Sequence, residues 1–330
     1  MQARIDIPEP VRKKALESGA VGEAWLDELG HRVGTLAALW RLTIGQALTG
    51  GTEALVVEAI TSDGRAAVLK VFPPRQSASA GEVATMVAAQ GRGYAEVYAV
   101  DESHEAILLE RLGPTLADMK LTVDSQLSII CETLIEAWVV PLDGERYTNG
   151  AEKADSLRDF INATWRDLSH PCSAPVIETA LGFASECRQR FDPSSAVLAH
   201  GDAHPWNTLL VPGTRPHRFK LIDPDGLFVE RAYDLAIPMR EWSEELIAGD
   251  PLQLGLARCY RLAELAKVEP EAIWQWGFLE RISTGLLCLQ LGFEEGQQML
   301  AVAESWAQLP SDHFRKQGEY KEMRESAEDR

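Results

Sequence analysis

The chain has 330 residues, of which 45% are apolar and 25% are charged, a composition typical of globular rather than disordered or fibrous proteins. No window approaches 18 uninterrupted apolar residues, and Asp6 interrupts an N-terminus that lacks an apolar stretch, so we expect neither a transmembrane helix nor a signal peptide. The net charge of −18 disfavours binding to nucleic acid or to anionic membranes. Five cysteines without a CxxC pair predict reduced, mostly buried thiols in a cytoplasmic protein.

The first 110 residues predict a small sheet-rich region that follows a helix. Residues 23–40 place apolar side chains at the spacing of a helix, and Asp63-Gly64 is typical of a tight hairpin turn. Pro73-Pro74 ends the strand that precedes it. Strands are predicted at 41–48, 54–60, 67–72, 95–100 and 105–110, with one internal helix at 80–90.

After Gly113-Pro114 breaks the chain, the pattern becomes mainly helical. Apolar side chains recur at helical spacing over 127–138, 155–167 and 176–190, and again from about 233 to 308. Residues 197–223 interrupt the helices with short apolar runs. We therefore predict two domains, a sheet-rich one over 1–111 and a helical one over 112–330.

Three polar residues in the interrupting segment indicate a metal-assisted phosphoryl-transfer site. Asp202 and Asn207 share one polar loop, and a predicted hairpin of 208–211 with 218–222 returns Asp223 beside that loop. The amide oxygen of Asn207 and the carboxylate of Asp223 suit Mg²⁺, which keeps waters and shares its ligands with substrate phosphates. Asp202 is then free to orient an attacking hydroxyl.

The pattern His200-Gly201-Asp202-x-His204-x-x-Asn207, followed by Ile222-Asp223-Pro224, resembles the signature of the aminoglycoside phosphotransferase family. The fuller pattern resembles the branch of streptomycin 6-kinases and hydroxyurea phosphotransferases, over about residues 20–308. Trp206 and Ala236 stand where the family commonly has glycine. The resemblance implies a two-lobed, protein-kinase-like α+β fold, with a sheet-rich N-lobe, a mainly helical C-lobe, and ATP and Mg²⁺ as cofactors.

The resemblance also implies a set of nucleotide-binding residues in the N-lobe. A lysine on the third strand should contact the α- and β-phosphates, and Lys70 is the only lysine between positions 15 and 119. Glu82, on the following helix, should hold its ammonium group. The alternative is a surface lysine and a solvated glutamate. The phosphate-covering loop would contain Gly50, Gly51 and Thr52, and the hinge that contacts adenine would contain Glu110 and Leu112.

For the C-lobe the resemblance implies that Asp202 is the catalytic base and that Asn207 and Asp223 hold the metal. Asp234 resembles a buried aspartate that accepts backbone N–H groups of the catalytic loop. His200 is interpreted as a scaffold residue of the loop, and so is His204, for which the alternatives are to orient Asp202 or to approach the nucleotide phosphates. The resemblance to the streptomycin 6-kinase branch implies a small cationic alcohol such as streptomycin as the acceptor, and the 11 basic against 19 acidic side chains of residues 227–330 agree with a cation. Its candidate contacts are Asp225, Glu241 and Trp242.

The sequence leaves several alternatives open. The nearest alternative is a kinase for another acceptor, such as a sugar, an amino alcohol, hydroxyurea or another antibiotic, since the catalytic residues are indifferent to the acceptor. A catalytically silent nucleotide-binding protein and an acid-rich interaction module belong to other classes. The intact Lys70, Asp202, Asn207 and Asp223 argue against the silent protein, and the interaction module predicts no thermal shift with Mg-ATP. The motifs do not distinguish ATP from GTP, or a monomer from a homodimer.

Overall fold

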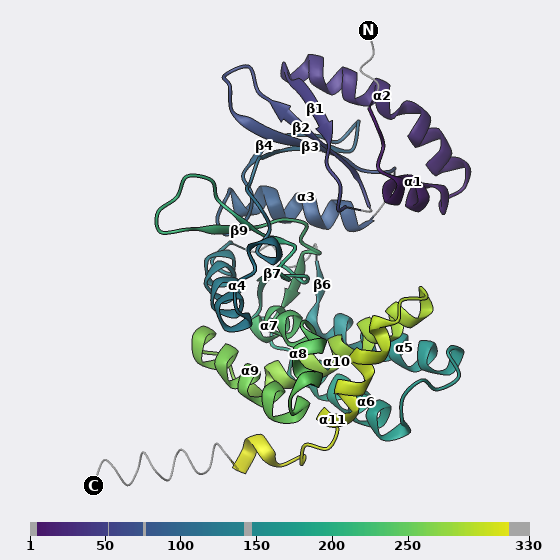
Figure 1. Ribbon diagram of the computed structural model, residues 1–330, viewed down its shortest axis with the longest axis vertical. Coiled ribbons are helices and arrows are strands. Elements are labelled where there is room, and N and C mark those ends of the chain that lie inside the picture. The colour runs from purple at the N-terminus through teal and green to yellow at the C-terminus, as the bar shows by residue number, and fades with distance from the viewer. Residues whose placement is uncertain (1–4, 52, 75–76, 142–146, 317–330) are drawn as a thin grey trace. The chain divides into compact units, whose positions relative to one another are not determined.

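A computed structural model describes residues 5–51, 53–74, 77–141 and 147–316, and the chain forms two compact units (Figure 1). The sheet unit comprises Met1–Met119 and Asn207–Gly226, and the helical unit comprises Lys120–Trp206 and Leu227–Arg330. The predicted division between 111 and 112 therefore differs from this arrangement in two ways. The first segment of the sheet unit ends later, and a second segment joins it from the middle of the chain.

The sheet unit is built on a five-stranded antiparallel sheet in the order β1-β2-β3-β5-β4. Side chains alternate along each strand, so that Leu55, Val57 and Ala59 of β2 are buried on one face. The strands are β1 (Thr43–Ala47), β2 (Leu55–Ile60), β3 (Ala66–Val71), β4 (Val97–Asp101) and β5 (Ala106–Glu110). All five strands predicted from the sequence are confirmed within a few residues.

Helices α1 (Glu9–Leu16) and α2 (Ala20–Trp40) pack against this sheet (Figure 1). The buried residues of α2 are three or four positions apart, which places them on one helix face: Trp25, Leu29, Val33 and Leu36. They join the buried β2 and β3 side chains in one apolar cluster. The helix predicted at 23–40 is confirmed, and the internal helix predicted at 80–90 is α3 (Ser77–Ala89).

A hairpin of β8 (Thr208–Leu210) and β9 (Phe219–Leu221) belongs to the sheet unit because backbone hydrogen bonds connect it to that unit. The N–H of Leu116 donates to the carbonyl oxygen of Thr208 at 2.7 Å, and the N–H of Ala95 donates to that of Leu221 at 2.9 Å. A short 3₁₀ helix, η1 (Ala117–Met119), follows the first of these contacts. The predicted hairpin is confirmed, and these contacts explain why it departs from the predicted domain division.

The helical unit surrounds one long buried helix, α10 (Pro270–Gln290), which packs against α5, α6, α7 and α11 (Figure 1). A helix that is apolar on all sides is expected to be enclosed by others. The other helices are α4 (Val123–Ala137), α5 (Gly150–Asp167), α6 (Ala174–Arg190), α7 (Arg231–Arg240), α8 (Ser243–Ala248), α9 (Pro251–Ala266) and α11 (Glu295–Trp306). A small sheet pairs β6 (Thr148–Asn149), β10 (Leu227–Val229) and β7 (Val197–Ala199).

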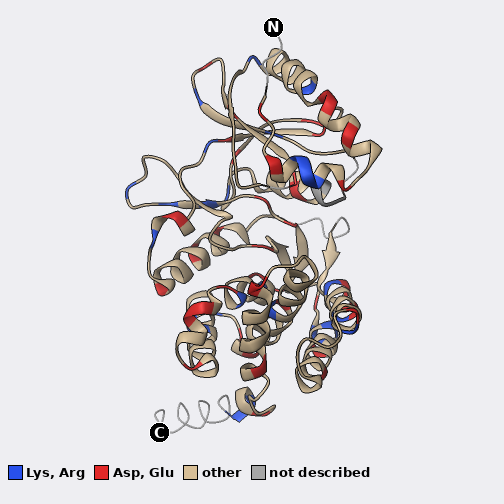
Figure 2. Ribbon diagram, turned by 45° about the vertical axis from the view of Figure 1, so that its right-hand side comes forward, with Lys and Arg blue, Asp and Glu red and all other residues tan. Residues whose placement is uncertain are grey.

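Two expectations drawn from composition can be checked in the described part of the chain. None of its helices is long and apolar enough to cross a membrane. All five cysteines are free, and four of them are buried. Figure 2 shows the acidic positions scattered along the helices of the helical unit, interspersed with basic ones.

Candidate active site

Lys70 and its carboxylate partners form the polar centre of the sheet unit. Strand β3 carries Lys70, whose Nζ lies 2.6 Å from Oε1 of Glu82 on α3 and 2.9 Å from Oδ1 of Asp223 after β9. The Lys70 side chain is only 8% exposed, so it is not a solvated surface lysine. The predicted pairing of Lys70 with Glu82 is therefore present, and Asp223 is a second partner 153 positions away in the sequence.

The electrostatics of this cluster favour a charged lysine. Burial disfavours the ammonium form, but the carboxylates of Asp223 and Glu82 outweigh burial and raise the pKa of Lys70 above its usual value. Burial also raises the pKa of Glu82, which lies near a second carboxylate at Asp223. One buried cation thus holds two acidic side chains together.

Two glycines let α3 approach the loop that follows β9. A Cβ atom added at Gly81 would lie 2.8 Å from the carbonyl oxygen of Asp225. A Cβ atom at Gly226 would lie 3.0 Å from the carbonyl oxygen of Gly81, and Gly226 has a positive φ of 70°. The backbone contact made possible by these glycines places Glu82, the next residue of α3, beside Lys70.

Asn207 and Asp223 are brought together by the hairpin that they flank. The N–H of Ile222 donates to the carbonyl oxygen of Asn207 at 3.0 Å. Asp223 has a left-handed φ of 57°, which Asp tolerates better than most residues, and its side chain is 44% exposed. One amide oxygen and one accessible carboxylate fit Mg²⁺, which is commonly held by one or two protein ligands plus waters and phosphates. Among the described residues, no three His, Cys, Asp or Glu side chains are grouped to hold a metal without help.

The remaining predicted nucleotide contacts lie elsewhere in the same unit. Gly50 has a positive φ of 116°, and Cβ atoms added at Gly50 or Gly51 would meet no atom within 4 Å, so this turn borders open space. Thr52 lies outside the described residues.

The predicted hinge residues follow the end of β5. The N–H of Glu110 donates to the carbonyl oxygen of Glu96 at 2.9 Å, and its carboxylate pairs with Lys220. Leu112 is only 5% exposed. The side chain of Glu110 therefore joins β5 to β9, and a contact of this hinge with adenine stays a prediction.

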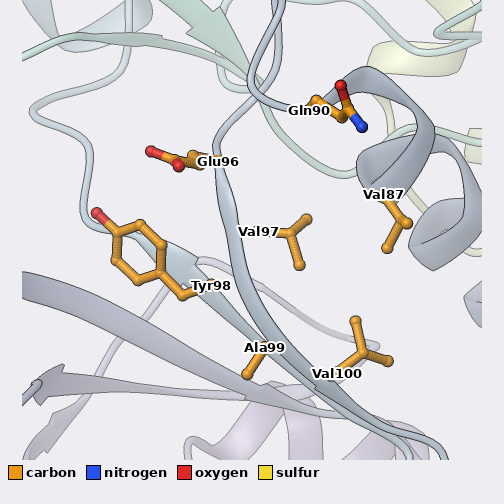
Figure 3. A pocket seen from close by; sticks show the side chains of 7 residues that line it. All are labelled: Val87, Gln90, Glu96, Val97, Tyr98, Ala99 and Val100. Atoms are coloured by element: carbon orange, nitrogen blue, oxygen red, sulfur yellow. The ribbon is translucent and has the colours of Figure 1, made fainter.

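A separate depression of about 300 Å³ lies between α3 and β4 in the sheet unit (Figure 3). Its walls are mainly apolar, and they contain none of the predicted site residues. The residues that line it are Val87, Gln90, Glu96, Val97, Tyr98, Ala99 and Val100.

Asp202 lies in the helical unit, on a loop after β7 that Asp234 of α7 holds in place. The carboxylate of Asp234 accepts hydrogen bonds from the N–H of His200 at 3.0 Å, the N–H of Gly201 at 2.8 Å and the indole N–H of Trp138 at 2.8 Å. Asp234 is completely buried, which raises its pKa, while these three donors favour its charged form. The prediction that Asp234 accepts backbone N–H groups of this loop is confirmed.

Two histidines fix the conformation around Asp202. Nδ1 of the fully buried His200 accepts the N–H of Asp202 at 3.0 Å. Nδ1 of His204 accepts the N–H of Trp206 at 3.2 Å, and Nε2 of the same ring faces Oδ2 of Asp202 at 3.3 Å. Both contacts fit the scaffold roles predicted for these histidines.

Arg240, the last residue of α7, forms an ion pair with Oδ1 of Asp202. Burial disfavours the charged carboxylate of Asp202, but the hydrogen bond from His204 and the charge of Arg240 outweigh it. Together they hold the pKa of Asp202 well below its usual range. Asp202 is therefore an ionised acceptor at neutral pH.

The three predicted acceptor contacts are divided between the two units. Asp225 follows β9 in the sheet unit, where its charge contributes to the raised pKa of Glu82. Glu241 and Trp242 follow α7 in the helical unit. The carboxylate of Glu241 pairs with Nε of Arg240 at 3.3 Å, and the guanidinium of Arg258 lies 5.2 Å from the centre of the Trp242 ring. The cation that Trp242 contacts in this structure is therefore an arginine of its own unit.

The sequence analysis assigned no role to Arg240 and Glu280. These two side chains form an ion pair, and Arg240 also pairs with Asp202. Nη1 of Arg240 lies 3.1 Å from Oε2 of Glu280, whose side chain is only 6% exposed. A signal was present, because Glu280 and Arg281 interrupt an otherwise apolar helix and a buried charge requires a partner. The pattern could not show which partner each of them had.

These parts define a class of protein. Phosphoryl transfer uses three components that are present here. They are a strand lysine held by a helix glutamate, an asparagine and an aspartate that offer oxygen atoms to a metal, and a loop aspartate in a fixed orientation. Together with the antiparallel sheet and the helical unit, they identify a kinase-like phosphotransferase with a hydroxyl acceptor. The chain belongs to the aminoglycoside/hydroxyurea antibiotic resistance kinases, whose family model matches residues 39–286.

Individual relatives agree with this assignment. The streptomycin 6-kinase of Streptomyces glaucescens is 26% identical over 283 residues, covering 83% of this chain and 89% of that protein. The streptomycin 6-kinase of Streptomyces griseus is 25% identical over 309 residues, covering 92% and 97%. The solved structure of the aminoglycoside phosphotransferase APH(3'')-Id from Streptomyces rimosus, in complex with ADP and streptomycin, has a TM-score of 0.52. It is 15% identical and covers 78% of this chain and 98% of that one, so this likeness concerns the fold.

Proposed function

We propose that this enzyme transfers the γ-phosphate of ATP to a hydroxyl group of a small cationic molecule, an aminoglycoside such as streptomycin. The observation that carries the ATP-dependent part is the buried Lys70 with its two carboxylates, Glu82 and Asp223. A buried ammonium is costly unless it is paired with opposite charges. Here the partners fix its position, and one of them, Asp223, remains half-accessible to a metal.

In this proposal each polar residue of the sheet unit has a separate role. Lys70, oriented by Glu82, binds the α- and β-phosphates. Asn207 and Asp223 would hold Mg²⁺, which, when bound, neutralises charge on the phosphate oxygens. The turn at Gly50 and Gly51 offers backbone N–H groups to the phosphates, because no side chain obstructs them.

Asp202 orients the acceptor hydroxyl and accepts its proton. Its lowered pKa makes Asp202 a weak base. A weak base fits a loose transition state, in which the acceptor hydroxyl loses its proton late. Nε2 of His204 faces Oδ2 of Asp202, and Arg240 pairs with its Oδ1. Asp202 therefore acts mainly by orientation and charge.

Three observations support a cationic acceptor. Residues 227–330 carry 19 acidic against 11 basic side chains. Trp206, four residues after Asp202, is 59% exposed, and such a ring attracts a guanidinium or ammonium group. The relatives named above are streptomycin kinases. We therefore add Trp206 to Asp225, Glu241 and Trp242 as candidate acceptor contacts, and we place the reaction in the cytoplasm, where ATP is available.

The test is turnover of Mg-ATP with streptomycin, alongside other aminoglycosides, hydroxyurea and choline, with Asp202→Ala as the blank. We expect phosphorylated streptomycin by mass spectrometry, with the rate reduced about 10²–10⁴-fold in the variant, as is usual for loss of a catalytic base. If only another member of the panel is phosphorylated, that compound replaces streptomycin as the proposed acceptor, and the proposed phosphoryl transfer stands. If no acceptor is phosphorylated and Mg-ATP does not raise the melting temperature, the proposal is wrong.

A further inference from the structure

Arg240 binds three carboxylates at once with its three guanidinium nitrogens. Nη2 pairs with Asp202, Nη1 lies 3.1 Å from Oε2 of Glu280, and Nε lies 3.3 Å from Oε1 of Glu241. The planar fork of an arginine fixes the directions of all three contacts, which a lysine could not reproduce. The direction in which Arg240 presents Nη2 to Asp202 is therefore set by its contacts with the other two carboxylates.

Glu280 is the most restrained of these carboxylates. Its side chain is 6% exposed and lies on the buried helix α10. The hydroxyl of Tyr233, which is also buried, donates to its Oε1. Glu280 is thus held by a neighbour on α7 as well as by its own helix, and it can serve as a rigid support for Arg240.

The end of α7, where Arg240 lies, is also held through its backbone. Nη2 of Arg281 donates to the carbonyl oxygen of Met239 at 2.7 Å, and Nη1 of Arg258 donates to that of Glu241 at 2.7 Å. These carbonyls would otherwise lack partners at the end of a helix. The backbone on both sides of Arg240 therefore has little freedom to move.

We propose that Arg240, supported by Glu280, is a positioning residue that sets the orientation of the Asp202 carboxylate toward the acceptor hydroxyl. The inference rests on the proposed function. The chain Tyr233–Glu280–Arg240–Asp202 transmits the rigidity of α7 and α10 to the catalytic loop. Asp234 holds the backbone of that loop and Arg240 holds its functional side chain, so the two contacts are complementary.

The test combines kinetic measurements with chemical rescue. In Arg240→Ala we expect kcat to fall on the order of 10²-fold, the cost typical of a catalytic group displaced by about an ångström. The KM for Mg-ATP should stay unchanged, because Arg240 is not part of the nucleotide site. Guanidinium ion at low, non-denaturing concentration should restore much of the lost kcat by occupying the space left in the variant.

Arg261→Ala is the matched control. Arg261 lies in the same unit and pairs with Asp124 at 3.1 Å, but it has no contact with Asp202. Its removal should leave kcat unchanged, and added guanidinium should not increase the rate. Two further variants decide the question if Arg240→Ala does not fold. Arg240→Lys should retain folding but recover only part of kcat, and Glu280→Gln should lower kcat with an unchanged KM for Mg-ATP.

Failure of this inference can be distinguished from failure of the proposed function. If the wild-type enzyme phosphorylates an acceptor and the folded Arg240 and Glu280 variants match its kcat, the positioning role is refuted and the function stands. The same variants are assayed for hydrolysis of Mg-ATP without acceptor, where Asp202 would orient water. That measurement tests Arg240 even if every candidate acceptor is inactive, and an unchanged hydrolysis rate in Arg240→Ala would also overturn the inference.

Discussion

At the scale of single residues, the carboxylate of Asp223 pairs with a buried lysine and still remains accessible to solvent. The lysine is Lys70, and the backbone of Asp223 adopts a left-handed conformation with φ of 57°. With this backbone conformation the side chain reaches Lys70 and remains 44% exposed. Asp223 can therefore contact a metal without leaving the lysine, because a carboxylate has two oxygens.

We predict that Asp223→Asn lowers turnover by at least about 10²-fold, as much as loss of the base. The amide keeps the shape of the side chain but removes the negative charge that Mg²⁺ and Lys70 both require. The measurement is the rate as a function of Mg²⁺ concentration, with the melting temperature as a check on folding. A variant with wild-type turnover at the same Mg²⁺ concentration would overturn the metal assignment.

Asp234 shows how strongly a buried charge depends on each donor. We predict that Trp138→Phe lowers the free energy of unfolding by about 1.5–3 kcal/mol beyond the loss of packing, because its indole N–H donates to this charged carboxylate. Trp165→Phe is the control, since its indole N–H donates to the neutral carbonyl of Cys172 and should cost about 0.5–1.5 kcal/mol. Equal losses in denaturant titrations would contradict a special role for Asp234.

At the scale of elements, α3 buries Met86 and Ala89, and two glycines let it approach the loop that follows β9. The backbone of Gly81 approaches the loop at Asp225, and Gly226 allows that loop its positive φ. A helix held by close backbone contact has little room to shift before Glu82 loses Lys70. Helix α3 and the loop that contains Asp225 and Gly226 should therefore move as one body.

We predict that Gly81→Ala weakens binding of Mg-ATP, because the added Cβ would lie 2.8 Å from the carbonyl oxygen of Asp225 and the backbone must shift. Gly34→Ala is the control within the same unit. It lies in α2, a Cβ there meets no atom within 4 Å, and alanine should stabilise the helix by about 0.5–1 kcal/mol. Calorimetric titration with Mg-ATP that finds equal affinities for both variants would contradict this account.

The elements themselves could be predicted from the sequence, but several of the contacts between them could not. Alternation in 54–60 and 67–72 and helical spacing in 23–40 gave correct strands and a correct helix, because periodicity records which face is buried. The pairing of Lys70 with Glu82 was accessible through the family pattern. The contact of Lys70 with Asp223 and that of Arg240 with Asp202 join separate elements, and no local pattern encodes them.

The predicted domain division differs from the two compact units for the same physical reason. The hairpin at 208–221 follows the catalytic loop in the sequence, so continuity suggested that both belong to one domain. Backbone hydrogen bonds from Ala95, Gly113 and Leu116 instead connect the hairpin to the sheet unit. Backbone groups are the same in every residue, so such contacts leave little trace in the sequence.

At the scale of the whole molecule, the charge of −18 acts on the encounter with substrate. We predict that raising the salt concentration from about 0.1 M to 1 M increases the KM for a cationic acceptor, because the Debye length falls from about 10 Å to 3 Å. The control is an uncharged acceptor or analogue, whose KM should change little. A KM for streptomycin that is indifferent to salt would argue against electrostatic attraction of the acceptor.

The distribution of thiols gives the enzyme a built-in reporter. Burial raises the pKa of Cys131 and Cys187 to about 12, so neither forms an appreciable amount of reactive thiolate at neutral pH. Cys288, on the same helix as Glu280, is the partly exposed one. A maleimide dye should therefore label the unmodified enzyme first at one position. The rate at which the buried cysteines are labelled afterwards would report how fast the helical unit opens, without any engineered probe.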